Sequence, residues 1–321
     1  MTPRLAHVLP LLAADMPCWL YRCRHWLAIL VTLLSCSAAK RTCACDSPSC
    51  CCRRPDAVTC VRREAWHVAD SSNFQVCSLK SETDARRVAL QCECLRNALT
   101  GTWNPDAETW NPRCQIVLHR DQASYVRAVG AGGEVTVGSS LATPVRGPIR
   151  TRRIDLRADV DDVLVAALPH ELCHLVLADR FRSGPAPLWF DEGVALQYDP
   201  AEKRQLHERD LRLGVQRGEI LPLTELLAES SYPPQNQWGV FYGQSGSLVR
   251  WLLKRESPEK LLQFVDRFRK LGASRALTET YGVADLDDLY HQWRNDAIAL
   301  DAPLPKHLML PPSTPFRLVS Q

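Results

Sequence analysis

The chain has 321 residues, of which 45% are hydrophobic and 23% are charged, and its formal net charge is +3. These values are typical of a soluble globular protein with a sizeable core, arranged as one large domain or two small ones. The positive charge is too small and too evenly spread to indicate nucleic-acid binding, so we expect no nucleic-acid partner.

The first residues of the chain resemble an export signal. Arg22 and Arg24 form a basic flank, and an apolar stretch follows over residues 26–36 and ends among small residues. A membrane-spanning helix needs roughly 20 apolar residues, so this shorter stretch suits the core of a signal peptide better. Met16 is an alternative start that would shorten the basic region. The alternative interpretation is a buried apolar segment of the folded domain.

Cysteines are concentrated near the N-terminus. Of the 14 in the chain, eight precede residue 55, and Cys36 ends the sequence LLSC, which resembles the lipobox of bacterial lipoproteins. Leu34 departs from that motif, which favours a small residue at this place. We predict that residues 1–62 are a signal or anchor segment and a Cys-rich linker, and that the protein is exported to the cell envelope or secreted, with Cys36 as a candidate membrane anchor. A metal or redox role of the cysteine-rich segment is a further hypothesis.

Residues 63–158 are predicted to form a β-rich part. Helical spacing of apolar residues predicts two helices here, one closed by Gly101 and one closed by Gly130. Alternating apolar residues and turn signals predict a pair of short strands within 66–78, and further strands at 114–119, 133–140 and 152–158.

Residues 159–300 show helical periodicity and no strand signal. One of the helices is delimited by Ser257 as its N-cap and by Gly272 beyond its end, and residues 301–321 form a proline-rich, irregular tail. Strands followed by helices predict an α+β fold, with an N-terminal mixed β-sheet and helices followed by a helical C-terminal half, in one domain over 63–300.

The helical part contains the pattern His-Glu-x-x-His, formed by His170, Glu171 and His174. Side chains four residues apart on a helix share one face, so both imidazoles can reach one zinc ion at roughly 2.0–2.1 Å. Glu171 would lie beside the metal, where it can take a proton from water and pass it to a leaving amine. Pro169 indicates either a helix that begins there or a kink in a longer helix from Asp161.

A catalytic zinc ion needs a third protein ligand and one open position. Metzincins take that ligand from a histidine six residues after the second one, but Arg180 stands there, and Leu177 replaces the glycine of their motif. A second helix that opens near Pro187 could instead run back along the first and bring Glu192 beside His174.

The sequences LPHELCHLVL and PLWFDEGVALQYD together resemble the gluzincin zinc metallopeptidases, and especially the bacterial peptidase MA-like domains. In that family the His-Glu-x-x-His helix is followed by a Trp-x-x-Glu-Gly-x-Ala segment, here Trp189, Glu192, Gly193 and Ala195. The resemblance covers residues 66–300. We expect Gly193 and Ala195 to let the two helices approach each other closely.

The resemblance implies one Zn²⁺ ion held by His170, His174 and Glu192, with Glu171 as the general base. Asp191 is either a hydrogen-bond partner of a ligand histidine or an acidic residue favoured by the helix dipole near an N-terminus.

The resemblance also implies a tyrosine that stabilises the oxyanion, and Tyr242 in the sequence FYGQSGSLVRWLL is the candidate. A buried aromatic of the core is the alternative for Tyr242, and Tyr232 and His207 are possible substitutes in the oxyanion role. The Gly-x-Met-Glu-Asn motif of gluzincin aminopeptidases is absent, and Glu134 lies outside such a motif. Aminopeptidase activity therefore loses support.

Together these features predict an exported zinc-dependent peptidase that hydrolyses peptide or protein substrates through a metal-activated water. The alternative is a catalytically inactive, zinc-bearing envelope module that binds a partner through the same groove. The substitution Glu171→Gln separates the two hypotheses, because it should abolish hydrolysis without releasing the metal.

Overall fold

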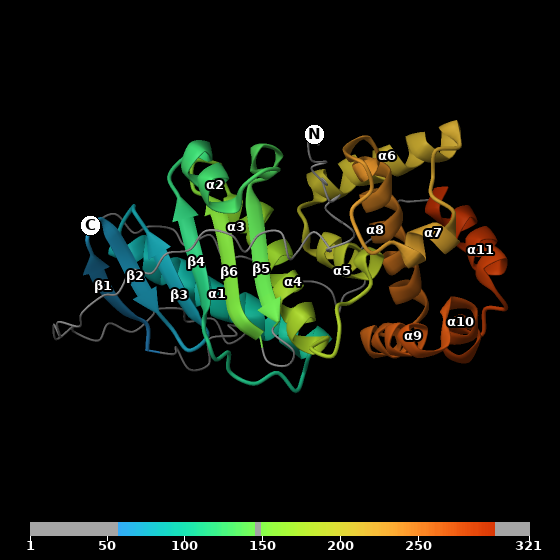
Figure 1. The fold of residues 1–321 in the computed structure, drawn as a ribbon, viewed down its shortest axis with the longest axis horizontal. Helices are drawn as coiled ribbons and strands as arrows, with labels where there is room; N and C mark the ends of the chain where they lie inside the picture. The colour runs from blue at the N-terminus through green and yellow to red at the C-terminus, as the bar shows by residue number, and fades with distance from the viewer. Residues whose placement is uncertain (1–56, 145–148, 299–321) are drawn as a thin grey trace, which may run out of the picture.

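The computed structural model describes residues 57–144 and 149–298 (Figure 1). The predicted export signal, the candidate anchor Cys36, the cysteine-rich segment and the tail at 301–321 lie outside these residues. The first described strand begins at Thr59, before residue 63, where the domain was predicted to start. Because only Cys60 of this strand is buried, its sequence lacks the apolar alternation that would have revealed it.

A mixed sheet of six strands forms the N-terminal part, in the order β1-β2-β3-β4-β6-β5. The central strands β3, β4 and β6 run parallel, whereas β1, β2 and β5 pair antiparallel with their neighbours. The bounds are Thr59–Arg63 for β1, Trp66–Asp70 for β2, Phe74–Ser78 for β3, Cys114–His119 for β4, Gly138–Pro144 for β5 and Ile149–Arg157 for β6. A helical half follows, and the predicted α+β class is thereby confirmed.

Two helices cover one face of this sheet, namely α1 (Glu82–Trp103) and α4 (Leu168–Arg180), while α2 (Gln122–Val129) follows β4 (Figure 1). Alternate residues of the central strands point toward them, and Phe74, Ile116 and Ile154 are fully buried there. The helix α4 packs on β5, β6 and α1, so the sheet fixes its position.

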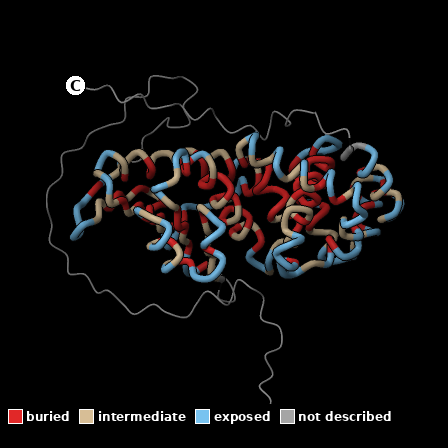
Figure 2. Tube along the Cα trace, turned by 90° about the horizontal axis from the view of Figure 1, so that it is seen from above, coloured by how far each residue is buried: buried red, intermediate tan, exposed pale blue. Residues whose placement is uncertain are grey.

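The helical half is built around α8 (Trp238–Arg255), which packs against α5 (Leu188–Ala195) and α6 (Ala201–Arg217). Figure 2 shows buried residues running through the middle of both halves, with exposed residues outside. The other elements are α3 (Val163–Ala166), α7 (Leu223–Ala228), α9 (Pro258–Leu271), α10 (Ala273–Tyr281), α11 (Leu286–Ile298) and the short 3-10 segments η2 (Gly133–Val135), η3 (Leu196–Tyr198) and η4 (Gln235–Gln237).

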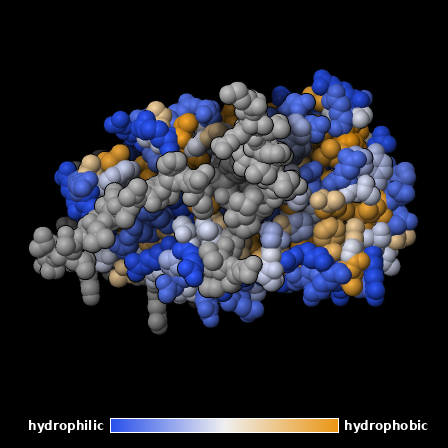
Figure 3. All heavy atoms as spheres, in the orientation of Figure 1, coloured by the Kyte–Doolittle hydropathy of each residue, from blue (hydrophilic) through white to orange (hydrophobic). Residues whose placement is uncertain are grey.

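No helix of the described chain has the length and apolar character needed to cross a membrane. The face drawn in Figure 3 is largely hydrophilic, and its hydrophobic residues lie in separate patches.

Other predicted boundaries also differ from the structure, and the strand predicted at 152–158 is β6 at Ile149–Arg157. The first long helix, α1, does not end at Gly101 but continues to Trp103, because the Trp103 side chain is fully buried and its Nε1 donates to the Tyr198 hydroxyl at 2.6 Å. Burial of a large apolar side chain contributes roughly 1.5–3 kcal/mol, more than the cost of about 1 kcal/mol for a glycine inside a helix. The strand predicted from residue 133 begins only at Gly138, because Gly130 and Gly132 have positive φ and form a turn before η2.

The structure decides between the two alternatives for Pro169. Helix α3 ends at Ala166, and a separate helix, α4, begins at Leu168 with Pro169 in its first turn. A proline is tolerated there because the first backbone N–H groups of a helix have no partner within it. The two histidines therefore lie on one uninterrupted helix.

Candidate metal centre

Helix α4 presents His170 and His174 on one face, with ring centroids 4.8 Å apart. The next helix, α5, begins at Leu188 after Pro187, as predicted, and carries Glu192. The side chains of all three residues meet, and one ligand atom from each lies within 4.8 Å of the others. Such a set could hold a metal ion.

The Glu192 carboxylate is buried and directs one oxygen toward both imidazoles. Its side chain is only 3% exposed, and Oε2 lies 3.7 Å from His170 Nε2 and 3.8 Å from His174 Nε2. This buried oxygen has no hydrogen-bond partner among the described residues. Atoms that share one tetrahedral zinc ion lie roughly 3.3–3.6 Å apart, and the distance from Glu192 Oε2 to each imidazole nitrogen is close to this spacing. The residues fit a divalent metal ion.

The outer nitrogen of each imidazole faces a carboxylate of its own. His174 Nδ1 lies 3.0 Å from Asp191 Oδ2, within hydrogen-bond distance. His170 Nδ1 lies 3.1 Å from Asp199 Oδ1, although the approach is too oblique for a straight hydrogen bond. Both contacts direct Nε2 toward Glu192, as carboxylates behind metal-binding histidines commonly do. Asp191 is thus the histidine partner that the sequence offered as one alternative, whereas Asp199 was not predicted.

Negative charge dominates this centre. Burial lowers the pKa of His174, but the charges of Asp191 and Glu192 outweigh burial and raise it to about 10. Burial also raises the pKa of Asp199, but His170 and Lys203 outweigh that effect and lower it. The carboxylates therefore favour a cation beside the imidazoles.

Glu171 lies at the edge of this cluster, in the first turn of α4. Its Oε2 accepts a hydrogen bond from Ser140 Oγ of β5 at 2.7 Å. The same strand carries Gly138, where an added Cβ would lie 2.8 Å from Ala167 Cβ and 3.2 Å from Glu171 Oε1. Only a glycine lets β5 approach α4 so closely, and this approach places an edge strand beside the Glu171 carboxylate.

The three candidates for an oxyanion donor occupy different positions. The Tyr232 hydroxyl donates to Glu192 Oε1. The Tyr242 hydroxyl has no hydrogen-bond partner among the described residues, and burial together with the charge of Glu192 raises its pKa. The His207 ring lies near that of Tyr242, with centroids 5.4 Å apart and the ring planes tilted by 52°, and burial lowers the pKa of His207.

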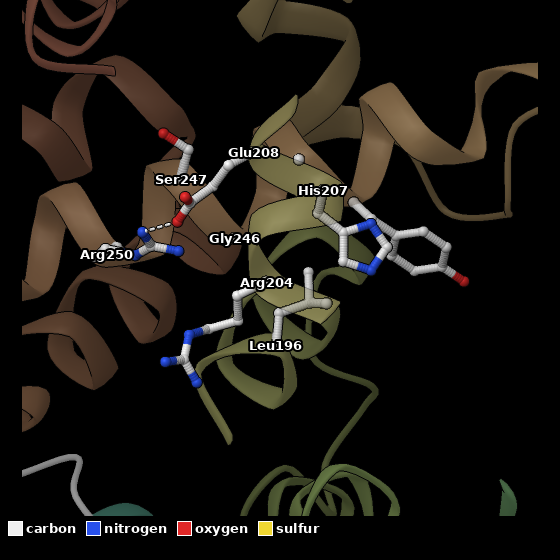
Figure 4. Close-up of a pocket in the computed structure, with 9 residues that line it drawn as sticks. Leu196, Arg204, His207, Glu208, Gly246, Ser247 and Arg250 are labelled. Carbon is white, nitrogen blue, oxygen red and sulfur yellow. Dashed lines mark hydrogen bonds and ion pairs between the residues drawn. The ribbon is translucent and has the colours of Figure 1, made fainter. Parts of the chain in front are cut away.

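A small pocket lies between α6 and α8 (Figure 4). Glu208 and Arg250 point toward each other there and form a largely buried ion pair, while His207 points away from them. Arg250 Nε donates to Gln197 Oε1 at 3.4 Å, and Gln197 Nε2 donates to the Gly193 carbonyl at 2.7 Å. These polar contacts tie α6 and α8 to the helix that carries Glu192.

Gly193 permits a close helix contact, but not the predicted one. An added Cβ would lie 2.5 Å from the Ser245 carbonyl oxygen and 2.5 Å from Val249 Cγ2, both on α8. The sequence-based expectation was that Gly193 would let α5 approach α4. The close approach of α5 is instead to α8, because α5 lies between α4 and α8 and turns this glycine toward the latter.

A comparison of the sequence with protein-family models finds no match, and a comparison with curated proteins finds none either.

Proposed function

We propose that the protein is a zinc-dependent peptidase of the gluzincin type, with a peptidase MA-like domain that includes the described sheet and helices. The observation that supports this most is the meeting of His170, His174 and Glu192 beside a separate carboxylate, that of Glu171. Two imidazoles and one carboxylate form a known donor set of catalytic zinc sites, and they leave a fourth position open. We expect one Zn²⁺ ion in this cluster.

The residues around the cluster suggest how hydrolysis would proceed. When bound, zinc would supply a Lewis acid that polarises the scissile carbonyl and lowers the pKa of water. Glu171 would take the proton of the attacking water and deliver it to the leaving amine. Ser140 fixes one oxygen of that carboxylate and leaves the other for the water. The Tyr242 hydroxyl, which has no hydrogen-bond partner among the described residues, would donate to the oxyanion.

Strand β5 supports a peptide or protein as the substrate. Within the described sheet it is an edge strand that pairs only with β6. An extended peptide can add to such an edge through main-chain hydrogen bonds. Because Gly138 and Ser140 of this strand adjoin Glu171, the added chain would pass the proposed general base.

The deciding experiment compares Glu171→Gln with the wild type on a broad peptide library and on unfolded protein substrates. We expect the variant to keep its zinc while hydrolysis falls by about 10²–10⁴-fold, the usual contribution of a general base. Glu225→Gln is the matched control, because Glu225 is an exposed glutamate of α7. If the wild type binds zinc and hydrolyses nothing, the inactive zinc-bearing module replaces the peptidase.

We further propose that the protein is exported and that its N-terminal segment is not needed for the metal centre. Removal of residues 1–56 leaves β1 intact and tests whether the N-terminal segment is needed for the metal centre. Zinc content and the thermal unfolding midpoint should be unchanged in the shortened chain. Loss of zinc on removal would favour the cysteine-rich segment as a metal-binding element.

A further inference from the structure

Tyr232 connects the metal centre to the segment between α7 and η4. Its hydroxyl donates to Glu192 Oε1, the carboxylate oxygen that does not face the imidazoles. The other oxygen, Oε2, is the one that approaches both Nε2 atoms. The two oxygens of Glu192 thus have different surroundings, one facing a hydrogen-bond donor and one facing the cluster.

We propose that Tyr232 is a positioning residue that restricts Glu192 to one metal-binding oxygen. A carboxylate can bind a metal through one oxygen or through both, and the second mode takes up an additional coordination position. A catalytic zinc ion needs that position for water or substrate. By holding Oε1, the Tyr232 hydroxyl keeps the position open. This inference rests on the proposed role of Glu192 as a metal ligand.

Tyr232 is 39% exposed, and its ring lies near aromatic residues of α8. Its ring lies 6.3 Å from the rings of Trp238 and Phe241 and 6.4 Å from that of Tyr242, measured between centroids. Trp238 Nε1 also donates to the carbonyl of Pro233 at 2.8 Å, which ties the segment to α8. These ring contacts on one side, together with the hydrogen bond to Glu192, hold the partly exposed phenol beside the cluster.

The same contact separates the roles of the two tyrosines. A phenol hydroxyl can donate one hydrogen bond, and the Tyr232 hydroxyl donates its hydrogen bond to Glu192. It therefore cannot donate to a substrate oxyanion while it holds the carboxylate. The Tyr242 hydroxyl has no hydrogen-bond partner among the described residues and remains the candidate donor to the oxyanion.

The test measures the metal rather than hydrolysis, in the full-length variants Tyr232→Phe and Tyr242→Phe. Zn²⁺ affinity is determined by competition with a chelator, and Co²⁺ is bound in place of zinc to record its visible absorption. Bands of four-coordinate Co²⁺ are much more intense than those of higher coordination numbers. We expect Tyr232→Phe to weaken zinc binding about 10–100-fold, the usual effect of removing a residue behind a metal ligand, and to reduce the Co²⁺ band intensity.

Tyr242→Phe should leave zinc affinity and the Co²⁺ spectrum unchanged, and the thermal unfolding midpoint of each variant reports whether it still folds. Wild-type affinity and spectrum in Tyr232→Phe would overturn the positioning role and leave the peptidase proposal intact. Absence of hydrolysis with an altered Tyr232→Phe spectrum would reject the peptidase alone. Failure of the wild type to bind either metal would overturn both.

Discussion

Asp199 Oδ1 lies 3.1 Å from His170 Nδ1, although Asp199 follows the two helices that carry the candidate metal ligands. The Asp199 side chain is completely buried, and Lys203 Nζ lies 3.1 Å from both of its oxygens and donates a hydrogen bond to Oδ1. Asp191 has the equivalent position behind His174. Each imidazole thus has its own carboxylate, one from the start of α5 and one from beyond η3.

We predict that Asp199→Asn lowers zinc affinity about 10–100-fold, because the amide carries no charge to raise the basicity of His170. Isothermal titration with Zn²⁺, or competition with a chelator, measures the change. Asp106→Asn is the control, since Asp106 is an exposed aspartate far from α4 in the sequence. Equal affinities in wild type and Asp199→Asn would show that the contact does not act on the metal.

Gly193→Ala should displace Glu192 through a clash between α5 and α8. The added methyl group would lie 2.5 Å from the Ser245 carbonyl oxygen, so α5 must move away from α8 and take Glu192 with it. Overpacking of this kind costs typically about 1–3 kcal/mol, and we expect weaker zinc binding as well. Urea unfolding and zinc titration measure the two effects.

Gly101→Ala is the matched control for this substitution. It also lies within a helix, but an added Cβ there has nothing within 4 Å. A glycine in a helix costs about 1 kcal/mol relative to alanine, so this variant should be more stable than the wild type. A loss of stability in both variants would mean that the α5–α8 contact is not the cause.

The residues that meet at the metal centre differ in how far the sequence could predict them. His170 and His174 follow from helical spacing alone, and Glu192 follows from the turn at Pro187 that reverses the chain. Asp199 and Tyr232 belong to no spacing pattern, because the irregular segments after α5 and α7 bring them to the site through tertiary packing. The sequence offered Tyr232 only as a possible oxyanion donor and gave no sign of its contact with Glu192 or of the role of Asp199.

The fold shows the same division. The ends of α9 at Ser257 and Gly272 were predicted correctly because the capping residues act locally. The predicted end of α1 was wrong because burial of Trp103 depends on its contact with Tyr198, and the local sequence pattern does not reveal that contact. Likewise, which helix Gly193 would face depends on the placement of α8.

Asp155 should make the stability of the fold depend on pH. Its carboxylate lies 2.7 Å from His119 Nε2 and accepts two hydrogen bonds from Arg153. Burial raises the pKa of Asp155, but the hydrogen bonds from His119 and Arg153 outweigh burial and lower it. A lowered pKa in the folded state stabilises the protein above the unfolded value of about 3.9 and loses that stabilisation as the pH falls through the folded value.

We therefore predict that the free energy of unfolding falls below about pH 4, and that Asp155→Asn has lower stability at neutral pH and a shallower fall. Urea unfolding at a series of pH values measures both. Asp106→Asn should retain the wild-type slope, because Asp106 is exposed. An unchanged slope in Asp155→Asn would assign the acid sensitivity to other carboxylates.

Asp179 anchors the far end of α4 to the sheet. Its side chain is fully buried and accepts hydrogen bonds from Arg152 of β6 at 2.7 Å, from Arg182 at 2.8 Å and from Trp110 Nε1 at 3.3 Å. Asp179→Ala would leave the Arg152 guanidinium, which is only 4% exposed, without a counter-charge. Breaking a buried ion pair in this way costs about 3–5 kcal/mol, and thermal or urea unfolding should show a loss of that size.

The ion pair between Arg180 and Asp266 provides the control on the same helix. Its N–O distance of 2.9 Å is similar, but both side chains are about one-third exposed, at 34% and 37%. Exposed pairs contribute only about 0–1 kcal/mol because water and salt screen them. Asp266→Ala should therefore cost far less than Asp179→Ala. Equal losses of stability in the two variants would mean that burial does not determine how much the Asp179 ion pair contributes to stability.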